Sequence, residues 1–319
     1  IGKEIILVKN VINDGDIFIF DRNGKGLRKF NRKGQGSEEY IFNLSVFLDE
    51  DKGEIYVDEV IRNVLVYDLY GNFLRNIQRD KVKWINASNY NSDFLIARES
   101  PSAQKGKDTD NQLFVLISKQ NGNVVKDFRI YFEKKIEWGI TNHAGNTGAA
   151  PRPYPIIPYH DGWLLMEPSS DTIFRISQDY SLSPFMARTP SIRSMKPAVF
   201  LLPCIFTDRY HFMETITMEA NLLRNEGFPK TQLVYDKKEN SLFEYTMLNN
   251  DFPEKGPVNF TMQETTNSEI AFWQKMEPHE LIEAYAKGQL KGKLKDIAAE
   301  LQEDSNPVIM LVKYRKVTL

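Results

Sequence analysis

The sequence predicts an all-β protein in which four-stranded antiparallel sheets form the blades of a six-bladed β-propeller. Residues 43–78 contain four short apolar runs separated by tight turns, and similar units recur along the 319-residue chain. A lone sheet of this kind leaves two faces and two edges uncovered. Packing such sheets around a ring covers the faces and the inner edges, so the repeated units favour a propeller.

The clearest unit is predicted to have strands at residues 44–48, 54–58, 64–68 and 73–77. These runs are rich in Val, Ile, Leu, Tyr and Phe, and the gaps between them contain Gly, Asn and Asp. Such gap residues tolerate the backbone angles of tight turns. Because gaps this short join only antiparallel neighbours, the unit is an up-and-down meander.

Other copies follow the same order of strands and turns. Residues 4–30 form the first copy, in which Asp21 matches Asp68 and Gly24 matches Gly71. Three later copies place Ser118, Ser177 and Asp236 at the Asp68 position, in residues 94–128, 162–185 and 209–248. The repetition predicts that each blade ends in the same kind of hairpin.

The sixth copy is interrupted. Strands are predicted at residues 269–275 and 306–317, and residues 278–301 between them have the apolar spacing of amphipathic helices. Gly288 and Gly292 are expected to divide this insert into two short helices. We expect residues 1–319 to form one domain, closed by pairing of the strand at 306–317 with the N-terminal strands. A pair of stacked β-sandwiches is the alternative architecture.

The charge balance gives no sign of a broad basic surface. The chain has 41 Lys and Arg against 43 Asp and Glu, so neither a nucleic-acid partner nor an anionic membrane surface is indicated. The single cysteine, Cys204, lies in the apolar run 200–206, which is too short to cross a bilayer. We therefore expect no transmembrane segment, and a buried, unreactive Cys204.

Three segments resemble a known family. They are FIFDRNGKGLRKFNRKGQGSEEY at residues 18–40, GEIYVDEVIRNVLVYDLYGNFLRNI at 53–77 and EDSNPVIMLVKYR at 303–315. The chain resembles the six-bladed β-propeller proteins of Bacteroides-type bacteria, which are related to NHL and YWTD propellers. Four residues match the family's glycine-rich turn, namely Gly34, Gly36, Glu39 and Tyr40, and Ser37 stands near an expected Gly or Pro.

The resemblance implies a location more than an activity. Such proteins are usually exported, often as lipoproteins, and most have no established activity. The expected location is the periplasm or the cell surface, with a lipid anchor and a signal segment that precedes Ile1 in the precursor.

The familiar catalytic and cofactor motifs are not found. Residues 32–40 fit neither a phosphate loop nor a dinucleotide fingerprint, so they are interpreted as a turn between blades. The four histidines, which include His143 and His211, lack metal-binding spacing, and no GxSxG elbow occurs. The carboxylates around Asp49 are expected in a solvated hairpin turn. No cofactor is predicted, although Ca²⁺ in the central channel is left open.

The best candidate ligand site is residues 136–160, rich in Gly, Asn and Pro. Its aromatic rings and arginine could form a flat platform for a sugar or a peptide. The proposed ligand contacts are Trp138, His143, Arg152 and Tyr154, with Trp84 from another inter-blade segment. Ordinary packing between blades is the alternative role for all of them.

Three functions follow from these observations. The first is an extracytoplasmic binding or scaffold module that recognises carbohydrate or peptide at one mouth of the ring. The second is a metal-dependent lyase or lactonase with its site in the central channel. The third is a platform for a protein partner, which would dock on residues 278–301 or on a blade edge.

Overall fold

The fold is described here from a computed structural model, which divides into two compact units. The described residues are 1–10, 14–42, 45–59, 63–79, 83–100, 110–136, 140–141, 147–149, 155–160, 162–219, 227–252, 256–258, 260 and 269–314. Unit 1 comprises Ile1–Ile136, Pro155–Ala187 and Thr265–Asn267, and unit 2 comprises Glu137–Tyr154, Arg188–Glu264 and Ser268–Leu319.

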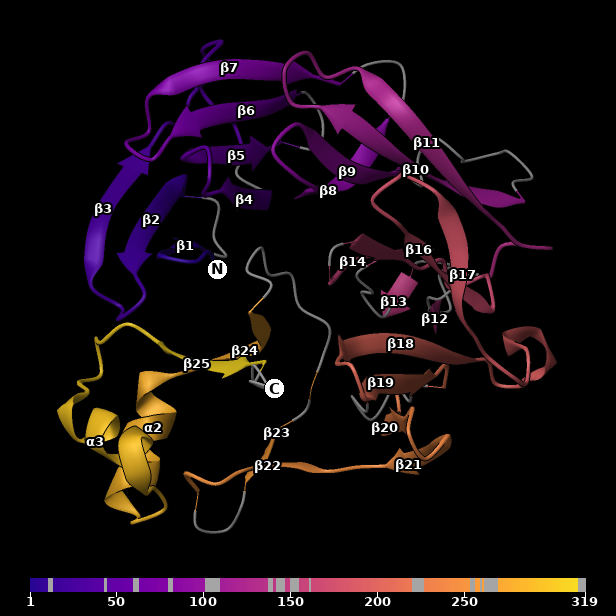
Figure 1. Ribbon diagram of the computed structural model, residues 1–319. Helices are drawn as coiled ribbons and strands as arrows, with labels where there is room; N and C mark the ends of the chain where they lie inside the picture. The colour runs from indigo at the N-terminus through magenta and orange to yellow at the C-terminus, as the bar shows by residue number, and fades with distance from the viewer. Residues whose placement is uncertain are drawn as a thin grey trace. The chain divides into compact units, whose positions relative to one another are not determined.

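Unit 1 contains four consecutive antiparallel sheets, the first with three strands and the others with four. The first is β1 (Ile5–Lys9), β2 (Asp16–Asp21) and β3 (Gly26–Asn31), and the second is β4 (Ser45–Asp49), β5 (Glu54–Asp58), β6 (Asn63–Asp68) and β7 (Phe73–Gln78). The third is β8 (Trp84–Asn89), β9 (Phe94–Glu99), β10 (Asn111–Ser118) and β11 (Val124–Tyr131). The fourth is β14 (Ile156–Tyr159), β15 (Gly162–Leu165), β16 (Thr172–Ile176) and β17 (Leu182–Ala187). Within each sheet the strands lie side by side in chain order, as β4 to β7 do in Figure 1.

Unit 2 contains one further four-stranded sheet and three strand pairs. The sheet is β18 (Val199–Phe206), β19 (Tyr210–Thr217), β20 (Lys230–Asp236) and β21 (Ser241–Glu244), after a 3₁₀ turn η1 (Ile192–Ser194). The pairs are β12 (Ile140–Thr141) with β13 (Thr147–Ala149), β22 (Met247–Asn249) with β23 (Gly256–Val258), and β24 (Ile270–Met276) with β25 (Val308–Lys313).

The predicted all-β architecture of consecutive antiparallel meanders is confirmed. In the described ladders β25 pairs with β24, its neighbour in the interrupted sixth copy. The three-stranded first sheet contains only β1 to β3 among the described residues. Pairing of the C-terminal strand with the first sheet, closure of a ring and the number of six blades therefore stay predictions.

The apolar core of unit 1 lies between successive sheets. One cluster joins the first sheet to the second through Ile17, Phe30 and Tyr67, and a second joins the second sheet to the third through Tyr56 and Val115. A third cluster joins the sheet of β8 to β11 with that of β14 to β17. The second and third sheets therefore bury both faces against a neighbour, which is the packing expected of blades.

At four of its five copies the repeated Asp68 position has the same structural role, in the turn between the last two described strands of a sheet. The Asp68 Oδ1 accepts hydrogen bonds from the backbone N–H of Tyr70 (2.8 Å) and Asn72 (2.9 Å). A side-chain oxygen accepts a backbone N–H in the same way at Asp21, Ser118 and Asp236. These are Asx-type turns, and they explain why short polar residues recur at this position.

Each of these turns ends with a residue in the left-handed backbone region. That residue is Gly24, Gly71 or Gly122 in the first three sheets, with φ between +77° and +85°. Glycine has no Cβ to clash in this conformation, so its recurrence follows from the turn. The fourth and fifth sheets have Tyr180 (φ +60°) and Asn240 (φ +50°) instead.

Residues 32–40 form the connection between β3 and β4, as predicted, without a helix. The buried Tyr40 hydroxyl donates to the carbonyl of Gly15 (2.5 Å) and accepts from the backbone N–H of Arg32 (3.0 Å). The Tyr67 hydroxyl donates to the Glu38 carbonyl (2.7 Å). These bonds attach the glycine-rich turn to the first two sheets, which accounts for it without a phosphate ligand.

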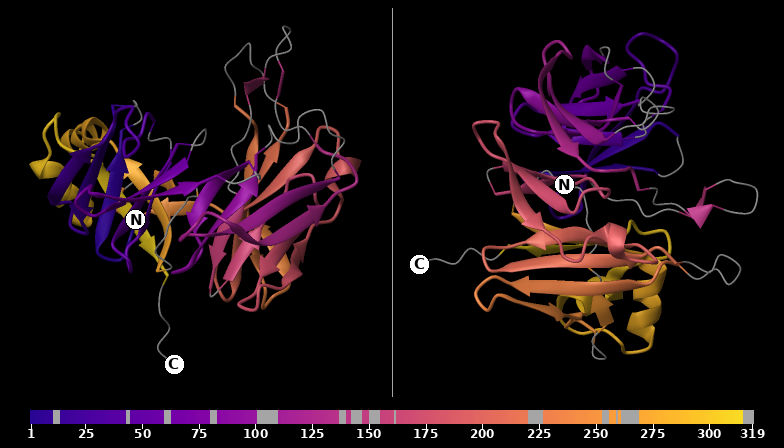
Figure 2. Two further views of the ribbon diagram at one scale, coloured as in Figure 1. Left: turned by 90° about the horizontal axis from the view of Figure 1, so that it is seen from above. Right: turned by 90° about the vertical axis from the view of Figure 1, so that its right-hand side faces the viewer.

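The helical insert also forms as predicted, with α2 (Pro278–Ala286) and α3 (Gly292–Glu300). Gly288 and Gly292 both have positive φ; Gly288 lies between the two helices and Gly292 is the first residue of α3. Leu281, Leu294 and Ala298 are buried together with Leu290, which lies in the link rather than on a helix. The helices pack beside β24 and β25 through Met276 and Val308 (Figure 1, Figure 2). No helix in the described part of the chain is long and apolar enough to span a membrane.

Candidate functional site

The ligand contacts predicted from the sequence are mostly outside the described residues. Trp138, His143, Arg152 and Tyr154 fall there, so their role stays a prediction. Trp84 is described, at the start of β8, and is 1% exposed. The Arg79 guanidinium lies over its ring, 3.8 Å from the centroid. At this position the structure shows core packing between two sheets.

The described residues of unit 1 line a polar pocket of about 520 Å³ between its second and third sheets. Three hairpin turns contribute to it: those between β4 and β5, β8 and β9, and β10 and β11. The lining residues are Lys52, Glu54, Arg75, Asp93, Phe94, Ser118, Lys119 and Gln120. The volume is within the range that holds a small ligand.

The floor of the pocket is a buried ion pair. Lys119 is 1% exposed, and its Nζ donates to Asp49 Oδ2 (2.5 Å), Asn89 Oδ1 (2.5 Å) and the Asn91 carbonyl (2.6 Å). These acceptors use all three ammonium donors. Burial lowers the pKa of Lys119, and the hydrogen bond and charge of Asp49 oppose that shift.

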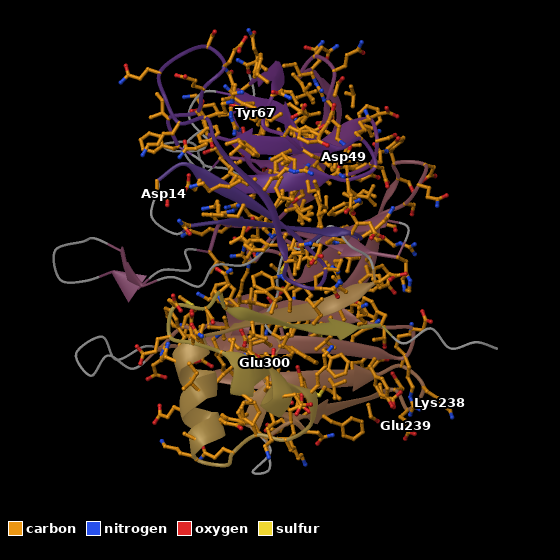
Figure 3. All side chains as sticks on the ribbon, turned by 90° about the vertical axis from the view of Figure 1, so that its left-hand side faces the viewer. Asp14, Asp49, Tyr67, Lys238, Glu239 and Glu300 are labelled. Atoms are coloured by element: carbon orange, nitrogen blue, oxygen red, sulfur yellow. The ribbon has the colours of Figure 1, made fainter. Side chains whose placement is uncertain are left out.

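The prediction that Asp49 lies in a solvated turn is wrong. The residue is 2% exposed and lies among closely packed side chains of unit 1 (Figure 3). Its partner Lys119 is 70 residues away in the sequence and belongs to the next sheet. The carboxylate is buried because it pairs with this ammonium group across the sheet boundary.

One wall of the pocket is a second ion pair. The Arg75 guanidinium donates to both oxygens of Glu54 (2.6 and 2.8 Å), and its Nε donates to the Lys119 carbonyl (3.1 Å). The Tyr56 hydroxyl donates to Glu54 Oε2 (2.6 Å). The hydrogen bonds from Arg75 hold the pKa of Glu54 below its ordinary value. This wall is therefore fixed in place and close to neutral overall.

The rim of the pocket has polar groups with spare hydrogen-bonding capacity. Within the described ranges, no partner is found for the Lys52 ammonium or the Gln120 side-chain amide. Asp93 is exposed, and Ser92 Oγ donates to its Oδ2 (3.1 Å). A carboxylate, an amide and an ammonium group can together bind hydroxyl or amide groups of a ligand.

Four aromatic side chains extend from the pocket toward the fourth sheet; we call them the aromatic row. Phe94, which lines the pocket, meets the edge of Tyr180 (centroids 6.2 Å, interplanar angle 79°). Tyr180 stacks on Tyr90 (6.1 Å, 30°), and Tyr90 stacks on Trp163 (5.7 Å, 21°). All four are partly exposed. Burial, followed by the effect of Tyr180, raises the pKa of Tyr90 to about 12.

The sequence analysis did not identify the aromatic row or the Lys119 pair. A signal for Tyr180 exists, because it is an aromatic residue where the matching turns have glycine. No comparable signal exists for Lys119 and Asp49, whose contact depends on how two sheets pack.

Cys204, His211 and other potential metal ligands also lie within the described ranges. Among the described residues no three His, Cys, Asp or Glu side chains lie close enough to hold a metal ion. Cys204 is buried, as predicted, and burial raises the pKa of its thiol to about 12. His211 lies against Phe206 (centroids 4.7 Å), and burial lowers its pKa to about 4.

Sequence comparison identifies a family profile but no characterised relative. The profile described as a domain of unknown function, DUF4934, matches residues 1–189. No protein of curated function matches the sequence.

A solved structure shares this fold, and two others match more weakly. A candidate exported protein from Bacteroides fragilis NCTC 9343 matches with a TM-score of 0.64 at 16% identity, covering 99% of this chain and 89% of that one. A DUF4221 member from Bacteroides vulgatus ATCC 8482 matches with 0.43 at 10% identity (79% and 86% covered). Virginiamycin B lyase from Staphylococcus aureus matches with 0.36 at 11% identity (72% and 77% covered). At such identities the first match shows a shared fold and nothing about activity.

Proposed function

Because the chain belongs to the DUF4934 family, whose function is unknown, we propose from its geometry that it is a ligand-binding module. The proposed ligand is a carbohydrate or a peptide, bound in the pocket between the second and third sheets of unit 1. The main support is that the pocket lies next to the partly exposed aromatic row, which it meets at Phe94. The rim of the pocket also holds polar groups for which the described residues provide no hydrogen-bond partner. Ligand sites combine apolar contact area with a few placed polar groups in this way.

The two ion pairs support binding because they fix the pocket before a ligand arrives. Lys119 joins the β10–β11 turn to Asp49 at the end of β4, and Arg75 holds Glu54 against the same turn. Polar groups held rigidly lose little conformational entropy on binding. The rim residues Asp93 and Gln120 extend from turns attached to this framework.

The protein is proposed to lie outside the cytoplasm and to carry a lipid anchor. Its sheets are proposed to close into a ring of six blades. The likeness to a Bacteroides protein described as exported supports the location. The first sheet has three described strands where its neighbours have four, which supports closure by a strand from elsewhere in the chain. Residues 136–160, with Trp138 and Arg152, are proposed as further ligand contacts.

The double variant Asp93→Ala/Gln120→Ala tests the pocket. Both side chains are exposed, so the variant should unfold at the wild-type urea concentration. Binding would be measured by calorimetry with hexasaccharides of glucose, xylose and galacturonic acid and with a hexapeptide library. We expect one class to bind the wild type, and the variant to bind it at least tenfold more weakly.

The matched control is Asn76→Ala/Lys126→Ala, two exposed residues on the outer strands β7 and β11. This control should bind like the wild type. Equal binding by the wild type and the pocket variant, or no binding of any probe by the wild type, would refute the proposal.

A further inference from the structure

We infer that Tyr180 is the stacking platform of this pocket and that the ligand is an uncharged sugar chain. The inference rests on the proposed function and narrows it to one ligand class and one specificity-determining residue. It is supported by the backbone conformation of Tyr180, by its place at the end of a three-ring stack within the aromatic row and by the charge balance of the pocket.

The first support is the unusual backbone of Tyr180. Tyr180 has φ +60° at a turn position that glycine occupies in the first three sheets. A bulky residue rarely adopts this conformation, because its Cβ crowds the carbonyl oxygen that follows. Residues held in such sparsely populated regions concentrate at functional sites. Asn240 has the same position in unit 2, but asparagine tolerates it.

The second support is the position of the Tyr180 ring. Tyr90 lies between Trp163 and Tyr180, so Tyr180 is the terminal ring of a three-ring stack. It is partly exposed, and its hydroxyl has no hydrogen-bond partner within the described part of the chain. Phe94 contacts both this ring and the pocket. A ligand that fills the pocket could therefore continue over Phe94 onto Tyr180.

The third support is charge. The buried pair Lys119 and Asp49 is neutral overall, and so is the pair Arg75 and Glu54. The rim adds one positive and one negative group, Lys52 and Asp93. Because these charges balance, the pocket has no net field that would attract an anionic or a cationic ligand.

The chemistry of the surfaces favours a sugar over a peptide. The C–H face of a pyranose packs on a flat aromatic ring, and its hydroxyls can donate to Asp93 and exchange hydrogen bonds with Gln120. Extended peptides are commonly held by pairing with a strand edge. Four of the eight residues that line this pocket lie in turns; the other four are the strand residues Glu54, Arg75, Phe94 and Ser118, and three of their strands, β5, β9 and β10, are already paired on both sides.

The test removes the ring but keeps the turn. Glycine at position 180 suits the left-handed backbone, so the strain that is relieved offsets part of the packing energy that is lost with the ring. The Tyr180→Gly variant should therefore keep its fold, which circular dichroism can verify. With cellohexaose, maltohexaose and xylohexaose as neutral probes, we expect at least one to bind the wild type. Tyr180→Gly should weaken that binding about tenfold or more, and Tyr180→Phe should keep it, because the ring remains.

Asn240→Gly is the matched control, since it makes the same turn substitution in the fifth sheet without removing a ring. It should bind the neutral probes like the wild type. Undiminished neutral-sugar binding by Tyr180→Gly would overturn the role of the ring.

The ligand class is tested separately with a hexamer of galacturonic acid and a hexapeptide library. The wild type could bind the galacturonic acid hexamer or a peptide but none of the neutral sugars. If the Asp93→Ala/Gln120→Ala variant then weakens that binding, the inference fails while the proposed function stands. If no probe of any class binds, both fail.

Discussion

Substitution of Lys119 by Met is expected to lower the free energy of unfolding by about 3–5 kcal/mol. The variant leaves Asp49, which is 2% exposed, as a buried carboxylate without its cation, and leaves Asn89 Oδ1 without its donor. A buried charge that loses its partner keeps its full desolvation cost. Urea denaturation followed by tryptophan fluorescence measures the change.

Lys52→Met is the matched control, because Lys52 lines the same pocket but is exposed. The Lys52→Met substitution should change the free energy of unfolding by no more than about 0.5 kcal/mol. Adding Asp49→Asn to Lys119→Met should recover part of the loss, since no unpaired charge then remains buried. A loss below about 1 kcal/mol for Lys119→Met would mean that water reaches the pair and that it does not join the two sheets.

Replacement of Gly122 by Ala is expected to lower the free energy of unfolding by about 2–5 kcal/mol. Gly122 has φ +77°, and a Cβ there would lie 2.4 Å from the Gln78 carbonyl oxygen at the end of β7. The left-handed backbone alone costs about 1–2 kcal/mol with a side chain. Forcing the two sheets apart adds about 1–3 kcal/mol.

The Gly24→Ala variant measures the backbone contribution without the packing contribution. Gly24 has φ +85° at the matching turn of the first sheet, but a Cβ there would meet nothing within 4 Å. Gly24→Ala should therefore show only the backbone cost, about 1–2 kcal/mol, in the same urea titration. Equal losses in the two variants would contradict the close packing of the β10–β11 turn on β7.

In the third, fourth and fifth sheets the sequence predicts the later strands better than the first strand, whereas in the second sheet the first strand is also predicted, at 44–48 against the observed Ser45–Asp49 of β4. Residues 54–58 match β5, and the 73–77 prediction ends one residue before β7 does. The first strands of the third, fourth and fifth sheets, β8, β14 and β18, are missing from the predicted strands. β14 and β18 contain proline, which usually argues against a strand. β8 and β18 have irregular pairing registers, which break the alternation of apolar and polar residues.

The candidate site could be predicted only in part, because its residues come from separate hairpins. Tyr90, Phe94, Trp163 and Tyr180 become neighbours when the third and fourth sheets pack together. The repeat marks Tyr180 as unusual, but no local pattern shows which rings it meets. The same holds for Asp49, whose local sequence resembles an ordinary acidic turn and whose burial depends on a lysine 70 residues away.

The most direct test of the proposed site is hydrogen–deuterium exchange on the intact chain, with and without the tightest-binding probe of the panel. We predict slower exchange in three turns of unit 1, at residues 90–94, 118–122 and 177–181, which hold the pocket rim and Tyr180. Protection confined to the helical insert at residues 278–301, or no change in those three turns, would contradict the account.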